Sequence, residues 1–217
     1  MTLAIFDLDE TLIGGDCSSL WSQWMCDIAW AHDGDFMAQN NALMAAYSEG
    51  RLAMEDYMQF SLSPLKGRAV TEVDGEVNTF IDAVIEARIF ADARTTVARH
   101  RADGDQLLVI SASGAHLVRP IAERLGIKDV LAIDLASRDG CYTGETEGIL
   151  TYREGKVTRL QQWLAASNFT MAGASFYSDS RNDLPLLSLV EKPYAVNADP
   201  TLAAHATQAG WPQLRWA

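Results

Sequence analysis

Five short apolar runs, separated by helical patterns, constrain the fold of this chain of 217 residues more than any other feature. The runs are rich in residues typical of buried β-strands, and the five cover residues 3–6, 106–110, 130–134, 174–177 and 193–196. Helical patterns occupy residues 94–102, 116–125, 157–166 and 184–190. Because strands that alternate with helices along a chain pair in parallel, the sequence predicts an α/β fold with a doubly wound parallel sheet.

A long insertion separates the first strand from the rest of the predicted sheet. Residues 15–88 are far more than one crossover helix needs, and they show helical periodicity without a convincing strand. One apolar stripe illustrates the pattern: Leu20, Trp21, Trp24, Met25 and Ile28. We therefore predict an all-helical cap domain at residues 15–88, inserted into an α/β core domain of residues 1–14 and 89–217. The predicted hinges are residues 14–15 and 88–92, and residues 137–150 are predicted to form a β-hairpin around Asp139-Gly140.

The negative charge of the chain is concentrated in the predicted cap. Residues 14–88 contain 12 Asp and Glu but 4 Lys and Arg, so this stretch carries −8 of the total net charge of −12. A solvated helical surface explains most such charges, and an alternative is that some of them favour a substrate that carries an amine. The acidic balance argues against nucleic acid or an anionic membrane as a partner.

The cysteines and the N-terminal residues predict a cytoplasmic protein. Cys17, Cys26 and Cys141 are an odd number without C-x-x-C spacing, so they are predicted to be reduced and buried. The apolar N-terminal run stops at Asp7, which is too short for a secretory signal, and no apolar run approaches the roughly 18 residues of a membrane span. We expect a monomer or a homodimer that binds neither nucleic acid nor membranes.

Polar residues follow several of the predicted strands. Asp7 and Asp9 come after the first strand, Ser111 after the second and Asp179 after the fourth. Because ligands of parallel α/β sheets bind beyond the carboxyl ends of the strands, these side chains are expected to share one crevice. Carboxylates beside a buried strand need a partner, and a cation such as Mg²⁺ suits hard oxygen ligands. The sequence therefore predicts a metal-assisted phosphate site.

Each of these segments also has a structural alternative when it is considered alone. Asp7-x-Asp9-x-Thr11 is compatible with an acidic strand end or a helix N-cap. Ser111-Ala112-Ser113-Gly114 is predicted to open a helix, where small residues let N–H groups approach an anion, but the same residues suit an ordinary turn. Lys156 at a helix start can hold a phosphate as a point charge, although most single lysines are only solvated. Asp183, one helical turn after Asp179, can bind or orient a metal shell.

In order and spacing these segments resemble the motifs of the haloacid dehalogenase-like superfamily, and the similarity covers nearly the whole chain. The resemblance implies that Asp7 is the nucleophile, which takes the phosphoryl group as an aspartyl-phosphate, and that Asp9 is the general acid and base. It also implies a Mg²⁺ held by Asp7, Asp179 and the main-chain carbonyl of Asp9, with Asp183 supporting the metal shell. The residues implied to hold the phosphoryl group are Ser111, Ala112 and Lys156.

A helical cap between the Asp7-x-Asp9 segment and the Ser111 segment resembles the phosphoserine phosphatase-like subgroup. This resemblance implies a Mg²⁺-dependent phosphomonoesterase for a small phosphorylated metabolite. Asp16 stands near the glutamate that meets the substrate amine in that subgroup, and Thr11 is expected to be a further substrate contact. However, Ser61 stands where a carboxylate-binding arginine is expected, and Ser111-Ala112-Ser113 replaces S-G-G. Histidinol phosphate is therefore an alternative substrate to phosphoserine. A phosphotransferase that uses the same aspartyl-phosphate and a catalytically silent binding protein are the alternative functions.

Overall fold

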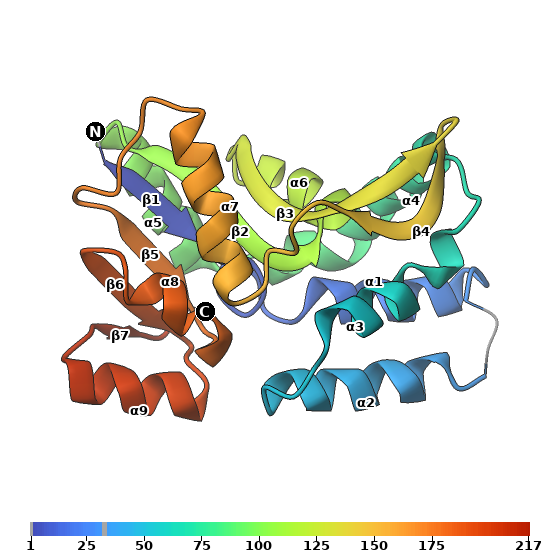
Figure 1. The fold of residues 1–217 in the computed structure, drawn as a ribbon, viewed down its shortest axis with the longest axis horizontal. Helices are drawn as coiled ribbons and strands as arrows, with labels where there is room; N and C mark the ends of the chain where they lie inside the picture. Colours follow the sequence, from blue (N-terminus) through green and yellow to red (C-terminus); the bar gives the residue numbers. More distant parts are fainter. Residues whose placement is uncertain (1, 32–33) are drawn as a thin grey trace.

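A seven-stranded sheet forms the centre of the computed structural model, which describes residues 2–31 and 34–217 (Figure 1). Its strands are β1 (Leu3–Phe6), β2 (Gln106–Gly114), β3 (Asp129–Arg138), β4 (Cys141–Glu147), β5 (Ser175–Ser178), β6 (Lys192–Val196) and β7 (Gln213–Leu214). Their order across the sheet is β4-β3-β2-β1-β5-β6-β7, and every neighbouring pair is parallel except β3 and β4. The predicted α/β fold with a mostly parallel sheet is confirmed.

Helices cover both faces of this sheet because its central strands are apolar on both sides. In β1, Leu3 and Ile5 belong to one buried cluster with residues of α7, α8 and α9, whereas Ala4 and Phe6 belong to another with residues of α5 and α6. These helices are α5 (Ala91–Ala102), α6 (Ala115–Arg124), α7 (Glu154–Ala165), α8 (Leu184–Leu187) and α9 (Pro200–Ala209). The alternation follows from strand geometry, in which successive side chains point to opposite faces.

The stretch between β1 and α5 is helical, as predicted. It contains α1 (Cys17–Asp27), α2 (Phe36–Ser48), α3 (Met54–Ser61) and α4 (Val70–Phe80), followed by a π-helical segment, Ile81–Ile85. Short 3-10 turns occupy Ser63–Leu65 and Glu86–Arg88, and no strand is assigned within residues 15–31 and 34–88. We call residues 15–88 the helical insertion; their division from the core as a separate domain stays a prediction.

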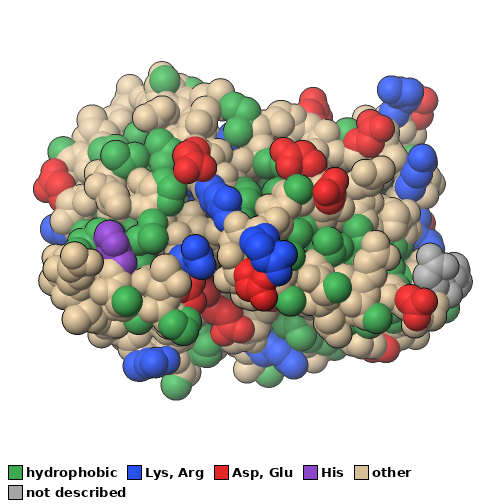
Figure 2. Space-filling model, turned by 60° about the horizontal axis from the view of Figure 1, so that its bottom comes forward, with side chains coloured by type: hydrophobic (Ala, Val, Ile, Leu, Met, Phe, Trp, Pro, Cys, Tyr) green, Lys and Arg blue, Asp and Glu red, His purple; other side chains and the backbone are tan. Residues whose placement is uncertain are grey.

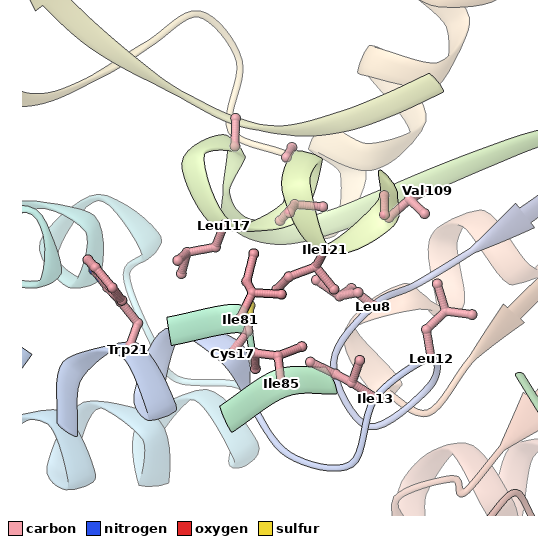
Figure 3. Close-up of a cluster of buried hydrophobic side chains, with 14 of the residues drawn as sticks. Leu8, Leu12, Ile13, Cys17, Trp21, Ile81, Ile85, Val109, Leu117 and Ile121 are labelled. Carbon is pink, nitrogen blue, oxygen red and sulfur yellow. The ribbon is translucent and has the colours of Figure 1, made fainter. Parts of the chain in front are cut away.

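One apolar cluster attaches the helical insertion to the α/β core. Figure 3 shows Leu8 and Ile13, which follow β1, near Ile81 and Ile85 of the insertion and Ile121 of α6. All five side chains are fully buried. Burying a side chain of this size contributes about 1.5–3 kcal/mol, so these contacts stabilise the junction substantially.

The predicted hairpin around Asp139-Gly140 is confirmed, and it makes a second attachment. β3 and β4 pair antiparallel, with φ of 53° at Asp139 and 78° at Gly140, as a two-residue turn with left-handed backbone requires. The Val70 N–H donates a hydrogen bond to the Gly140 carbonyl at 2.9 Å, and the Gly67 N–H donates one to the Tyr142 carbonyl at 2.8 Å. The insertion therefore contacts the core at α6 and at this hairpin.

Some element boundaries differ from the sequence-based prediction. β2 continues to Gly114, with an irregular register after Ile110, whereas the prediction ended this strand at Ile110. α6 begins at Ala115 with Gly114 as its N-cap, so residues 111–114 lead into a helix as predicted. At a β-bulge a strand contains unpaired residues and then pairs again. The apolar pattern of residues 106–110 does not show that β2 pairs with β3 again at Gly114. α8 ends at Leu187, and α9 and β7 lie in a stretch of small and polar residues for which no element was predicted.

The surface and the cysteines also qualify two expectations from composition. Figure 2 shows acidic and basic side chains next to one another near the middle of the face it draws, so the net charge of −12 does not give that region a single sign.

Cys17 is buried, but Cys26 and Cys141 are only half-buried, so the predicted burial is wrong for these two free thiols. Within residues 2–31 and 34–217, no helix is both long and apolar enough to cross a membrane.

Candidate active site

The carboxyl ends of three neighbouring strands bring the predicted site residues together. β1 lies between β2 and β5, so Asp7, residues 111–113 and Asp179 meet at one end of the sheet. A cavity of about 230 Å³ lies at this end, and Asp7, Asp9, Ala112, Ser113 and Asp179 are among its lining residues. This is where ligands bind in parallel α/β folds, at a strand flanked by connections that run in opposite directions.

Lys156 is the centre of a buried network of charges. Its ammonium Nζ donates a hydrogen bond of 2.7 Å to Asp7 Oδ1 and lies 2.7 and 2.8 Å from the two carboxylate oxygens of Asp183. The Ser178 hydroxyl donates to Asp183 Oδ2 at 2.7 Å, and the Lys156 side chain is only 3% exposed. Burial opposes the charged form, yet the Asp183 and Asp7 carboxylates raise the pKa of Lys156 above its usual value. The lysine therefore remains a cation beside the predicted nucleophile.

Burial shifts the pKa values of Asp7 and Asp9 upward, toward neutral pH. Burial raises the pKa of Asp7 to about 7, with the charge of Asp183 adding to the effect and Lys156 opposing it. Burial also raises the pKa of Asp9 to about 7, together with the charges of Asp16 and Asp7. A carboxyl group with such a pKa can both give and take a proton at neutral pH, as a general acid and base must.

The donor set beside Asp7 fits Mg²⁺. Burial, followed by the charges of Asp7 and Asp183, raises the pKa of Asp179 well above its usual value, so a cation beside Asp179 would stabilise its charged form. Among residues 2–31 and 34–217, no three His, Cys, Asp or Glu side chains are arranged to hold a metal ion. The predicted set has only two carboxylates, from Asp7 and Asp179, with the Asp9 carbonyl. Mg²⁺ tolerates such a small set because it keeps several water ligands.

The end of β2 places the predicted phosphate-binding residues beside Asp7. Ser111 is fully buried, and its hydroxyl accepts a hydrogen bond of 3.1 Å from the Ser113 N–H. The Thr151 hydroxyl donates to the Ser111 carbonyl at 2.5 Å, which fixes the same segment from the other side. Ala112 is among the residues that line the cavity, and Ser111 and Lys156 are not.

The helical insertion supplies the other walls of the cavity. Asp16 lines the cavity and also caps α1, since its carboxylate accepts a hydrogen bond of 2.6 Å from the Ser19 N–H. Thr11 is fully buried, is not among the lining residues and directs its hydroxyl to Asp179 Oδ1 at 3.5 Å, so its contact with a substrate stays a prediction. Ser61 is likewise absent from the lining. Sequence analysis missed several lining residues from the insertion, namely Ser18, Met44, Tyr47, Met54 and Tyr57.

Arg153 makes a further contact between core and insertion that the sequence did not indicate. Its guanidinium donates to the Gly50 carbonyl of the insertion and, through Nε, to Asn182 Oδ1 at 3.1 Å. The backbone of Arg153 has a φ of 51°, which is unusual for a residue with a side chain. The contact holds the loop between α2 and α3 next to Asn182, the neighbour of Asp183 in sequence.

Comparison with known proteins decides the family. A model of the haloacid dehalogenase-like hydrolases matches residues 4–188. The chain belongs to this family. It is 37% identical to a histidinol-phosphatase of Neisseria meningitidis serogroup C (strain 8013), over 99% of this chain and 98% of that protein. Its relatives place it among the phosphatases of the family, as the motifs predicted.

Solved structures agree with this assignment at the level of the fold. A crystal structure of a protein of unknown function from Bordetella pertussis Tohama I superposes with a TM-score of 0.91 at 35% identity, covering 99% of both chains. A phosphoserine phosphatase in a phospho-aspartyl intermediate analogue state superposes with a TM-score of 0.72 at 20% identity, covering 99% of this chain and 92% of that one. The second likeness supports the predicted phosphoserine phosphatase-like fold with its helical insertion.

Proposed function

We propose that this protein is a Mg²⁺-dependent phosphatase that hydrolyses the phosphate monoester of a small alcohol carrying an amine. The observation that carries the proposal is the charge of the cavity: five acidic side chains line it, and no Lys, Arg or His is among its described lining residues. The five are Asp7, Asp9, Glu10, Asp16 and Asp179. The predicted metal and acid–base roles use three of them, which leaves Asp16 and Glu10 for the rest of the substrate.

The same charges disfavour a substrate with a carboxylate. The carboxylate of phosphoserine would lose hydration and meet only acidic groups and neutral side chains, which discriminates against it. An ammonium group instead finds the Asp16 carboxylate, and the side chains of Met44, Tyr47, Met54 and Tyr57 offer an apolar wall to a flat ring. Histidinol phosphate combines an amine with an imidazole ring and has no carboxylate. The 37% identity to a histidinol-phosphatase supports the same choice.

In the first chemical step, a carboxylate oxygen of Asp7 forms a bond to phosphorus while the bond from phosphorus to the alcohol oxygen breaks. The protonated carboxyl of Asp9 gives its proton to that leaving oxygen, which therefore departs as a hydroxyl group and not as an alkoxide. Lys156, held against Asp7, offsets the repulsion between a carboxylate and the phosphate dianion. The products of this step are the alcohol and an aspartyl-phosphate at Asp7.

In the second step, the Asp9 carboxylate takes a proton from water as the water oxygen bonds to phosphorus. The bond from phosphorus to Asp7 breaks, which regenerates the Asp7 carboxylate and releases inorganic phosphate. Asp9 is again protonated, so the cycle closes without net proton loss from the enzyme. A bound Mg²⁺, held by Asp7, Asp179 and the Asp9 carbonyl, supplies positive charge that lowers the repulsion in this site.

Phosphate release from a panel of phosphorylated metabolites, with Mg²⁺ and with EDTA, tests the proposal. The panel contains histidinol phosphate, phosphoserine, sugar phosphates and nucleotides. We expect release only with Mg²⁺, and a kcat/KM for histidinol phosphate at least about tenfold above that for phosphoserine, as one uncompensated charge implies. A preference for phosphoserine would contradict the substrate class, and no release from any compound would contradict the phosphatase itself.

Asp16→Asn separates the amine contact from the chemistry. Asparagine also caps helices, so the substitution removes the charge and keeps the start of α1. We expect KM for histidinol phosphate to rise by about 10- to 100-fold, since a charge-assisted hydrogen bond is lost, while KM for an alkyl phosphate without an amine stays the same. Because the charge of Asp16 also raises the pKa of Asp9, any change in kcat should be shared by both substrates. Asp27→Asn, an exposed position on the same helix, is the matched control and should change neither substrate.

A further inference from the structure

Ser113 links the helical insertion to the predicted acid–base residue. Its hydroxyl donates a hydrogen bond of 2.8 Å to Asp9 Oδ2, and the Ser18 hydroxyl of α1 donates to Ser113 Oγ at 3.1 Å. Ser113 is 5% exposed and Ser18 is 9% exposed, so water competes little for these bonds. A chain of hydrogen bonds therefore runs from α1, across the end of β2, to the carboxyl group of Asp9.

The other oxygen of the same carboxyl group is also held. Asp9 Oδ1 accepts a hydrogen bond of 2.6 Å from the main-chain N–H of Cys17. The terminal torsion of an aspartate is broad and roughly two-fold, so a single hydrogen bond leaves the carboxyl plane poorly defined. Two donors on opposite oxygens restrict that plane, and both of them depend on the irregular end of β2 and on the start of α1.

We propose that Ser113 is a positioning residue, which holds the Asp9 carboxyl in the orientation that proton transfer to the leaving oxygen requires, with Ser18 fixing Ser113 from the helical insertion. The proposal rests on the phosphatase function proposed above. In the S-G-G pattern of phosphoserine phosphatase-like enzymes a glycine stands at this position, and glycine has no hydroxyl to give. Here the Ser111-Ala112-Ser113 sequence supplies one.

Dependence on the leaving group distinguishes this role from a merely structural one. An alkoxide is a poor leaving group and needs the proton from Asp9 as the bond to phosphorus breaks. A p-nitrophenolate leaves without protonation. The kcat/KM value covers the steps up to departure of the alcohol, so a misaligned Asp9 lowers kcat/KM for an alkyl phosphate and spares p-nitrophenyl phosphate. Damage to the fold or to phosphate binding would lower both.

The experiment compares Ser113→Ala and Ser113→Thr with the unmodified enzyme on histidinol phosphate and on p-nitrophenyl phosphate, with thermal unfolding as the check of folding. We expect Ser113→Ala to lower kcat/KM about 10- to 100-fold for the alkyl phosphate and less than about threefold for the aryl phosphate, as partial loss of general acid catalysis implies. Ser113→Thr keeps a hydroxyl and should restore much of the loss, and Ser18→Ala should show a smaller effect in the same direction. Ser175→Ala, a buried serine at the start of β5, is the control without effect.

Two outcomes overturn the proposal while leaving the proposed function in place. These are an equal loss on both phosphates with Ser113→Ala, and no loss on either. If the unmodified protein releases no phosphate from any monoester in the presence of Mg²⁺, the proposed function fails, and the role of Ser113 fails with it.

Discussion

The two ends of the cavity are built in opposite ways. At the core end, charged groups hold one another: Lys156 bonds Asp7 and Asp183 at 2.7–2.8 Å, and Ser178 bonds Asp183 at 2.7 Å. At the insertion end, Met44 and Met54 bring no strong polar groups, and the buried hydroxyl of Tyr57 has no hydrogen-bond partner among the described residues. The core end has a fixed geometry, whereas the insertion end leaves polar capacity for a ligand.

This difference matches the two tasks of the proposed enzyme. Transfer of a phosphoryl group needs reacting atoms held in line, and a network of buried charges at the carboxyl end of the sheet supplies that precision. Recognition of one alcohol among many depends on shape and on a few polar contacts, which the insertion supplies from α1, α2 and α3. Substitutions of Asp7 and Lys156 are therefore expected to affect every substrate, and substitutions at the insertion end only some.

Asp7→Asn gives the largest expected effect and tests the core end directly. The amide cannot act as the nucleophile, so turnover should fall by at least about 10⁴-fold on every phosphomonoester, as removal of a nucleophile does in other hydrolases. Phosphate release measures the loss, and circular dichroism should show an unchanged fold. The control Asp103→Asn, at an exposed position, should keep full activity. Residual turnover within tenfold of the unmodified protein would remove Asp7 from this role.

Lys156→Met tests whether the core end also stabilises the fold. Removing the ammonium leaves the carboxylates of Asp7 and Asp183 buried without their partner, and breaking a buried ion pair in this way costs about 3–5 kcal/mol. Urea unfolding measures the free energy of unfolding, which should fall by that amount. The same substitution at the exposed Lys128 is the control and should stay within about 0.5 kcal/mol. Equal stability of the two variants would show that the network serves chemistry alone.

Mg²⁺ should stabilise the protein, and more strongly at higher pH. The folded pKa of Asp7 and Asp9 is about 7, above the ordinary 3.8, so the folded state binds more protons between these values and stability falls as the pH rises from about 4 to 7. A cation bound to the ionised carboxylates offsets this loss. At 100 times its Kd, Mg²⁺ should add about 2.7 kcal/mol at pH 8, and less at pH 5, where protons compete. Thermal unfolding with Mg²⁺ and with EDTA measures the stabilisation at pH 8 and at pH 5. An equal increase of Tm at the two pH values would contradict binding of Mg²⁺ to ionised Asp7 and Asp179.

The residues of the core end could be located from the sequence because they lie at short, fixed distances from elements that the sequence also reveals. Asp7 and Asp179 directly follow apolar strands, and Lys156 lies in the first turn of a helix. The contact of Ser113 with Asp9 joins residues 104 apart in the chain and depends on an irregular strand end, for which the pattern gives no signal. The helical periodicity of residues 15–88 predicts helices in this stretch, but whether Met54 and Tyr57 face the cavity depends on how α3 packs.

The hydrogen bonds of Asp105 with His100 and Thr2 lie outside the cavity, and removing them gives the smallest expected effect. They contribute to stability at acid pH independently of the carboxyl groups in the cavity. Burial raises the pKa of Asp105, but hydrogen bonds from His100 and from Thr2 outweigh this effect and lower the pKa to about 2. Because this value lies below the ordinary 3.8, Asp105 stabilises the fold fully above about pH 4, and the contribution is lost as the pH falls from about 4 to 2. Asp105→Asn should remove about 1 kcal/mol at pH 7 and flatten the pH dependence in that window, whereas Asp103→Asn should not. Urea unfolding at pH 2.5, 4 and 7 measures this, and an unchanged slope in Asp105→Asn would assign the acid sensitivity to other carboxyl groups. The contribution of Asp7 and Asp9 to the free energy of unfolding falls as the pH rises, whereas that of Asp105 falls as the pH decreases. One pH titration of stability therefore distinguishes the two regions.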